Sequence, residues 1–167
     1  INNVIMEASS HGLSQNRLDG LLFNTGIFTN LSQDHLDYHK NTKNYLKAKL
    51  YLFENLIKKR GNIITDEKIP EFKKIKNIAS YKNLNLFSLL DKKNNFQFLS
   101  HQYEGEYQLL EIKYKNSIHK IKLNLIGKVQ FKNVLMAVIA SIKSGINIED
   151  ILNTIPKIKS VEGRFER

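Results

Sequence analysis

Short apolar runs alternate with helix-like segments along the first half of the chain, and this alternation constrains the fold more than any other feature. The runs "VIMEA", residues 21–29 and "GNIITD" have the length and composition of buried strands. Residues 42–58 and the stretch "IPEFKKIKNI", which has Pro70 near its start, have helical patterns. Because strands that alternate with helices favour a parallel sheet covered by helices, we predict an α/β fold with a mostly parallel, doubly wound sheet.

The pattern changes between residues 84 and 125, where apolar and polar residues alternate. Turn signals at "EGE" and "KNS" divide this part of the chain. We predict a small antiparallel β meander of about three strands over residues 84–125, appended to the parallel core. The apolar run "VQFKNVLMAVIASIKSG" then predicts a buried helix that Gly145 ends, and "NIEDILNTIPKI" predicts a further helix with Asn147 as its N-cap.

Composition excludes several classes of protein. The chain contains no cysteine, so disulfides and cysteine-based metal sites are excluded. No apolar stretch approaches the roughly 20 residues of a membrane span. A net charge of +10 raises the possibility of nucleic-acid binding, but the lysines are scattered and arginine occurs at four positions. We therefore expect no nucleic-acid and no membrane partner, whereas affinity for small anions is compatible with the charge.

Lys49 occupies an unusual position in the predicted helix 42–58. At 100° per residue it lies in the middle of an apolar stripe. The stripe is formed by Tyr45, Leu52, Phe53 and Leu56, with Leu46 and Ile57 at its border. An unpaired buried ammonium is costly, so such a lysine normally loses its proton or acquires a partner.

Two interpretations of Lys49 remain open from helical spacing alone. The side chain could extend past its neighbours to water, as long side chains readily do. Alternatively, its neutral amine could add carbon dioxide and form a carbamate, whose two anionic oxygens would bind Mg²⁺ as a carboxylate does.

The loop "TNLSQDHLDYHKN" places Asp34, His35, Asp37 and His39 within six residues after a predicted strand. It is either a working site or a solvated turn. Glu7 follows the first predicted strand, and open α/β sheets bind ligands at the carboxyl ends of their strands. The acid at the strand end and the histidine-rich loop make a metal site near Lys49 worth considering.

Four stretches resemble the central domain of the Mur ligase family in order and spacing. They are "MEASSHGLSQNRLDG", "FTNLSQDHLDYHKNTKNYLKAK", "LIGKVQFKNVLMAVIAS" and "VEGRFER", and together they cover almost all of residues 1–167. The resemblance is greatest to the branch that adds the third amino acid to the peptidoglycan stem peptide. It implies a cytoplasmic, ATP-dependent ligase with a P-loop-type fold that joins UDP-MurNAc-dipeptide to meso-diaminopimelate or L-lysine through an acyl phosphate. It also implies ATP and Mg²⁺ as cofactors and a monomeric complete enzyme.

The resemblance implies roles for three residues near the metal. Glu7 and His35 would be Mg²⁺ ligands close to the ATP phosphates. Lys49 would be carbamylated (N6-carboxylysine) and would hold a second Mg²⁺. Mg²⁺ prefers oxygen, so His35 alone would be a poor ligand. His11 and His39 could act behind these ligands or could stabilise loops.

The resemblance also implies substrate and nucleotide contacts. Ser9, Gln15 and Arg17 would bind the UDP-MurNAc-dipeptide, with Arg17 facing its anionic portion. Asn133 would lie near adenine, and Arg164 would belong to the hinge that leads to a C-terminal domain. Ser9 could instead cap the segment that follows it.

The chain departs from the family pattern in two respects. Gln130 stands where the family motif has asparagine. No G-x-x-x-x-G-K-[ST] loop occurs in the chain. We expect it to be a partial central domain without the P-loop segment, the N-terminal UDP-binding domain and the C-terminal domain, and to be inactive by itself. The alternatives are a related ligase of the folylpolyglutamate type or a basic, non-catalytic α/β module that binds polyanions.

Overall fold

The structure is a computed structural model that describes residues 3–32, 35–90, 95–125 and 127–159. The chain divides into two compact units. Unit 1 comprises Ile1–Ile63 and Lys68–Leu86, and unit 2 comprises Ile64–Glu67 and Phe87–Arg167. Within the described ranges, no helix is long and apolar enough to cross a membrane.

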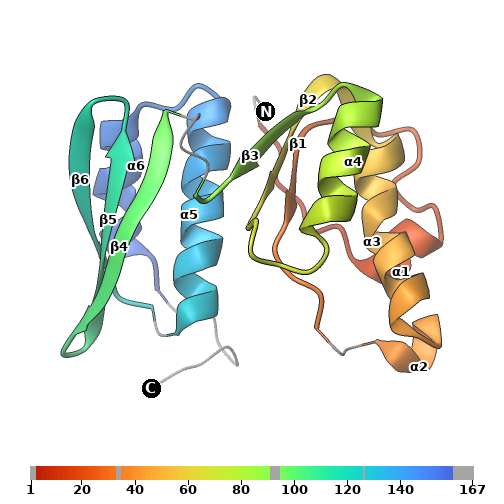
Figure 1. Cartoon of the computed structure of the whole chain (residues 1–167), viewed down its shortest axis with the longest axis horizontal. Coiled ribbons are helices and arrows are strands. Elements are labelled where there is room, and N and C mark those ends of the chain that lie inside the picture. Colours follow the sequence, from red (N-terminus) through yellow and green to blue (C-terminus); the bar gives the residue numbers. More distant parts are fainter. Residues whose placement is uncertain (1–2, 33–34, 91–94, 126, 160–167) are drawn as a thin grey trace. The chain divides into compact units, whose positions relative to one another are not determined.

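Helices separate the strands in the first seven elements, with two successive helices between β1 and β2 (Figure 1). They are α1 (Ser10–Ser14), β1 (Phe23–Phe28), α2 (Leu36–His39), α3 (Thr42–Asn55), β2 (Ile57–Thr65), α4 (Phe72–Lys82) and β3 (Asn85–Ser88). The strands form a three-stranded parallel sheet in the order β1-β2-β3, which confirms the predicted α/β class. Figure 1 shows α3 and α4 side by side on one face of this sheet.

The core of unit 1 lies between that sheet face and the two helices. Phe28 of β1, Phe53 of α3, Ile63 of β2 and Ile75 of α4 are fully buried in one cluster. The Asn41 side chain begins α3 by accepting a hydrogen bond from the Asn44 N–H at 2.9 Å. The apolar stripe predicted for this helix faces the core, since Phe53 belongs to the stripe and to the buried cluster.

One predicted helix end and one predicted strand in unit 1 are wrong. The helix expected to reach Lys58 ends at Asn55. The Leu56 carbonyl instead accepts the Phe23 N–H at 2.8 Å, so sheet pairing replaces the last helical turn. The run "VIMEA" is not a strand, and Val4 and Ile5 are 76% and 98% exposed. In the described part of the chain the sheet consists of β1, β2 and β3, and this run pairs with none of them.

Gly61 in β2 lies where a side chain cannot fit. A Cβ atom there would approach Ile57 Cγ2 to 2.6 Å, the Lys58 carbonyl oxygen to 2.8 Å and the Asn24 carbonyl oxygen to 2.9 Å. The two carbonyls belong to the sheet backbone and cannot move independently. We expect Gly61→Ala to lower the free energy of unfolding by about 2 kcal/mol, measured by urea denaturation.

Gly105 provides the control for this prediction. Its φ of +60° disfavours alanine, but no atom lies within 4 Å of the added Cβ. Gly105→Ala should therefore cost about 1 kcal/mol from backbone conformation alone. An equal loss in the two variants would contradict the proposed steric origin.

Unit 2 contains the antiparallel sheet. Its strands are β4 (Phe96–Glu104), β5 (Tyr107–Tyr114) and β6 (Ser117–Leu123), in the order β4-β5-β6. They are followed by α5 (Lys128–Lys143), α6 (Ile148–Thr154) and a 3₁₀ turn (Ile155–Lys157). The appended antiparallel sheet is confirmed, but it begins at Phe96 rather than near residue 84 because Asn85–Ser88 pair in the parallel sheet instead.

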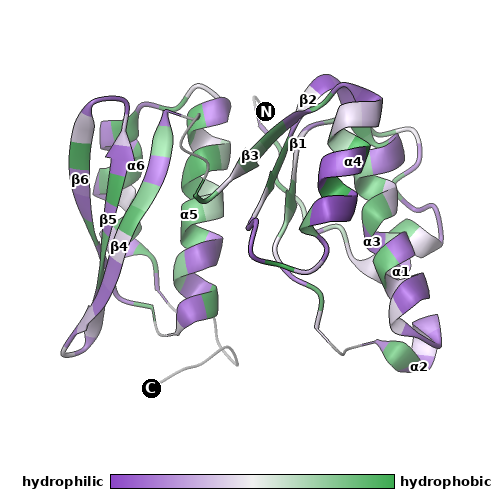
Figure 2. Ribbon diagram, viewed as in Figure 1, coloured by the Kyte–Doolittle hydropathy of each residue, from purple (hydrophilic) through white to green (hydrophobic). Residues whose placement is uncertain are grey.

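The core of unit 2 lies between this sheet and α5. Leu110 and Ile112 of β5, Leu123 of β6 and Leu135 of α5 have no exposed surface. Figure 2 shows hydrophobic residues running along α5. These residues explain why a three-stranded meander is stable here, since a small sheet needs a packed face.

The ends of the two unit 2 helices agree with the prediction. Gly145 has a φ of +87° after α5, and its N–H donates to the Ile142 carbonyl at 3.0 Å. The Ile146 N–H donates to the Ser141 carbonyl at 3.1 Å, which completes a Schellman motif. Asn147 caps α6 by accepting the Glu149 N–H at 3.1 Å.

Candidate functional site

Lys49 lies on α3 opposite the carboxyl end of β1. Its Nζ donates a hydrogen bond to the Asn30 carbonyl at 2.6 Å. The same atom lies 4.9 Å from the centre of the Phe28 ring and 5.5 Å from that of Tyr45. Burial lowers the pKa of the Lys49 amine, while the charge of Glu71 opposes this shift. The amine is thus half-buried between two aromatic rings rather than extended into bulk water.

Tyr45 connects Lys49 with the histidine-rich loop. Its ring stacks on His39, with centroids 5.1 Å apart and an interplanar angle of 18°. His35 approaches the same ring edge-on at 6.0 Å. His35 is exposed and has a φ of +56°, a conformation uncommon for residues other than glycine. The structure therefore places two predicted site residues, His35 and Lys49, around one buried tyrosine.

His39 is a buried structural partner of this cluster. Its Nε2 lies 2.9 Å from Ser10 Oγ, and the two residues are 5% and 7% exposed. Burial lowers the pKa of the His39 imidazole, and the nearby His11 and His35 lower it further. The hydrogen bond between His39 and Ser10 joins α2 to α1, so the structure shows a stabilising contact for His39.

The predicted muramoyl-binding residues lie on and after α1. Ser9 caps this helix, and its Oγ accepts the Gly12 N–H at 3.1 Å. Gln15 Nε2 donates to the Tyr38 hydroxyl at 3.1 Å, which helps to lower the pKa of that phenol. Arg17 is exposed. The cap uses an acceptor position of the Ser9 hydroxyl and leaves its proton available to a ligand.

Glu7 is the remaining predicted metal ligand. Glu7 lies on the exposed segment before α1. Within the described residues, no group of three or more His, Asp or Glu side chains is arranged to hold a metal ion. The predicted set contains only two such side chains, Glu7 and His35, because its third member is a modified Lys49. The magnesium site therefore stays a prediction. Asp34 and Arg164 lie outside the described residues.

Asn133 and Gln130 lie half-buried on α5 in unit 2. Beside Asn133, the ammonium of Lys132 pairs with the Asp66 carboxylate at 2.5 Å. Asp66 directly follows the carboxyl end of β2 and is 2% exposed. The sequence offered one signal for Asp66, an acid directly after an apolar strand, but none for its partner.

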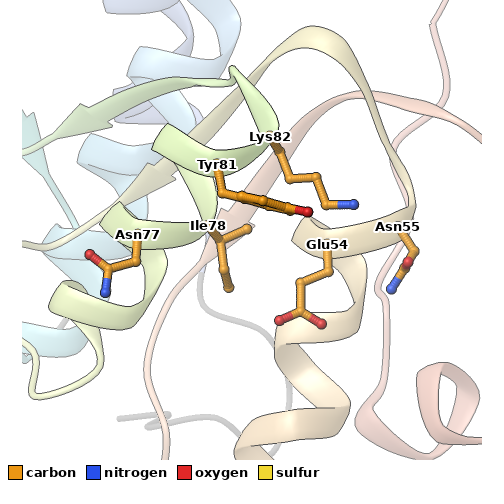
Figure 3. A pocket seen from close by; sticks show the side chains of 6 residues that line it. All are labelled: Glu54, Asn55, Asn77, Ile78, Tyr81 and Lys82. Atoms are coloured by element: carbon orange, nitrogen blue, oxygen red, sulfur yellow. The ribbon is translucent and has the colours of Figure 1, made fainter.

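A hollow of about 420 Å³ lies elsewhere in unit 1. Its side chains come from the C-terminal parts of α3 and α4 (Figure 3). They belong to Glu54, Asn55, Asn77, Ile78, Tyr81 and Lys82. None of the predicted site residues lines this hollow, so it is not the site that the sequence predicts.

The chain is similar to known proteins along its whole length. Residues 1–141 match the family described as Mur ligase middle domain. The UDP-N-acetylmuramoyl-L-alanyl-D-glutamate–2,6-diaminopimelate ligase of Rickettsia montanensis is 34% identical over 167 residues, which are 100% of this chain and 35% of the relative. The chain spans about a third of the length of the curated relatives that it matches.

Solved structures show the same likeness. One structure of a UDP-N-acetylmuramoyl-L-alanyl-D-glutamate–2,6-diaminopimelate ligase is 25% identical, with a TM-score of 0.80 over 94% of this chain and 32% of that chain. The MurF ligase of Thermotoga maritima in complex with ADP is 14% identical, with a TM-score of 0.72 over 95% of this chain and 35% of that chain. At that identity the second likeness concerns the fold alone.

Proposed function

The chain belongs to the Mur ligase family through its middle domain, and on this premise we propose that the complete protein is an ATP-dependent, cytoplasmic ligase of peptidoglycan synthesis. It adds a diamino acid, meso-diaminopimelate rather than L-lysine, to UDP-N-acetylmuramoyl-L-alanyl-D-glutamate. Relatives of that name support the choice of substrates. The observation that carries the proposal is the position of Lys49, an amine held between aromatic rings where the family uses a modified lysine.

The proposed reaction brings the substrate carboxylate and the phosphates of ATP together, so negative charge accumulates at the site. The substrate carboxylate attacks the γ-phosphate of ATP, ADP leaves, and the amine of the diamino acid then displaces phosphate from the acyl phosphate. Such a site must neutralise charge and hold the reactants in line. Arg17 would face the anionic part of the muramoyl substrate, and the Asn133 amide would contact adenine.

The donor set fits Mg²⁺ once Lys49 is modified. Glu7 and the carbamate would supply hard oxygen ligands, and His35 would supply a nitrogen. When bound, the ion supplies charge neutralisation at the phosphates. The carbamate forms when the neutral Lys49 Nζ attacks the carbon of carbon dioxide. A nitrogen–carbon bond forms, a carbonyl electron pair moves onto oxygen, and one N–H proton passes to water.

The substrate requirement tests this function. With the complete protein, ADP release should require both UDP-MurNAc-dipeptide and a diamino acid, and diaminopimelate should be used better than lysine. Release of ADP that depends on folate would indicate the folylpolyglutamate type of ligase. If no muramoyl acceptor leads to release of ADP, the proposed function is refuted.

Ser9 allows its capping role to be separated from a substrate role. Glycine is tolerated at an N-cap at a cost of a few tenths of a kcal/mol, whereas alanine costs about 1 kcal/mol. We expect Ser9→Gly to raise the KM for UDP-MurNAc-dipeptide about tenfold by removing the hydroxyl donor, with a nearly unchanged melting temperature. Steady-state kinetics and a thermal melt measure the two effects. An unchanged KM in Ser9→Gly would refute the substrate role of Ser9 and would show that this residue only caps α1.

A further inference from the structure

Beyond the assigned roles, we propose that Ser10, His39 and Tyr45 form a positioning chain that holds the Lys49 amine at the carboxyl end of β1. The inference rests on the proposed function, because that function gives Lys49 its role. The sequence predicted no role at the site for Ser10 or Tyr45, and it left His39 open between a place behind the metal ligands and a loop contact. All the contacts of the chain lie within unit 1.

The first link joins two helices that are distant in sequence. Ser10 Oγ and His39 Nε2 are 2.9 Å apart and separated by 29 positions. Among the described residues of unit 1, these two are the buried polar side chains. Burying polar groups is favourable only when they are paired, so this hydrogen bond specifies how α2 sits against α1.

The second link fixes the plane of an aromatic ring. The His39 imidazole lies nearly parallel to the Tyr45 ring at 5.1 Å, and Tyr45 is 5% exposed. A ring that is stacked on one face and enclosed by the core cannot rotate freely. Figure 1 shows α1 and α2 on the same side of the parallel sheet as α3, which carries Tyr45. Both helices contact α3.

The third link is the contact between the Tyr45 ring and the Lys49 amine. Residues four apart on a helix are neighbours, and Lys49 Nζ lies 5.5 Å from the centre of the Tyr45 ring. Phe28 lies on the amine at 4.9 Å, and the Asn30 carbonyl receives its hydrogen bond at 2.6 Å. Without the Tyr45 ring, the flexible lysine would gain space and water on one side. A carbamate formed there would then be less firmly oriented.

Two substitutions of Tyr45 in the complete protein test the chain. Tyr45→Leu removes the ring, and Tyr45→Phe keeps it. We expect Tyr45→Leu to reduce kcat about tenfold to a hundredfold, because small misplacements of reacting groups have effects of this size, with an unchanged KM for ATP. The carbamate signal of Lys49, observed by ¹³C NMR after incubation with ¹³C-bicarbonate, should fall as well. Tyr45→Phe should retain both.

Tyr51→Leu is the matched control on the same helix. Tyr51 is half-buried and its hydroxyl donates to Asp19 at 2.9 Å. Because it is two positions from Lys49 on the helix, the two side chains do not face each other. The Tyr51→Leu variant should retain kcat and the carbamate signal. If Tyr45→Leu does not fold by circular dichroism, Ser10→Ala serves instead. That variant removes only the first link and should lower kcat about threefold to tenfold.

The outcomes separate this inference from the proposed function. A wild-type protein that releases no ADP in the complete mixture refutes the function itself. An active wild type accompanied by a folded Tyr45→Leu with normal kcat and carbamate refutes only the positioning chain. Equal losses in Tyr45→Leu and Tyr51→Leu, in proportion to lost folded protein, also refute it, because they indicate a general packing effect.

Discussion

Replacing Lys49 with alanine is expected to lower kcat of the complete protein by a factor of about 10³, the size of effect seen when a group that stabilises developing charge is removed. The KM values should change little, since the carbamate would act on the transferred phosphate rather than on the uridine or the amino acid. Loss of the side chain opens a space beside Phe28 and Tyr45, which now enclose the amine. Short carboxylic acids such as acetate should enter this space and restore part of the activity.

Lys47 supplies the control for this experiment. It lies on the same helix and is exposed, so Lys47→Ala makes the same substitution without reaching the candidate site. Kinetics of both variants, with and without added acetate, distinguish a local role from a general effect of substituting a lysine of α3. Full activity in Lys49→Ala would refute the role assigned to this residue, and rescue of Lys47→Ala by acetate would show that the rescue is not specific.

The neighbourhood of Lys49 shows what local sequence patterns can predict. Helical spacing places Lys49 in an apolar stripe, and the structure confirms that Tyr45 and Phe53 of this stripe are buried. The spacing could not identify Phe28 as the second aromatic neighbour, because that ring comes from β1. It also gave no means to choose between a solvated and an enclosed amine, since the choice depends on contacts from other elements.

The errors in the fold have a similar origin. An apolar run such as "VIMEA" becomes a strand only where it pairs with another strand, and it pairs with none of the strands in the described part of the chain. The alternating pattern predicts residues 85–88 in the meander, whereas they pair in the parallel sheet, because alternation does not say which sheet a strand joins. In contrast, Asn147 and Gly145 act through their own backbone neighbours, so their capping roles were predicted correctly.

Asp66 and Lys132 illustrate a contact that local patterns do not reveal, since 66 positions separate them. Their burial is unequal: the Asp66 side chain is 3% exposed and that of Lys132 is 38% exposed. Removing the ammonium leaves a buried carboxylate without this counter-charge, whereas removing the carboxylate leaves an ammonium that water can reach. The two single substitutions should therefore have different effects on stability.

We expect Lys132→Met to lower the free energy of unfolding by about 3 kcal/mol, and Asp66→Asn to lower it by about 1 kcal/mol. Urea denaturation followed by circular dichroism measures both changes. The double variant should lose less stability than the sum of the two single losses. The buried carboxylate that loses its counter-charge in Lys132→Met is absent from the double variant. Equal losses in the single variants, or strict additivity in the double variant, would show that the pair does not stabilise unit 2 through this buried charge.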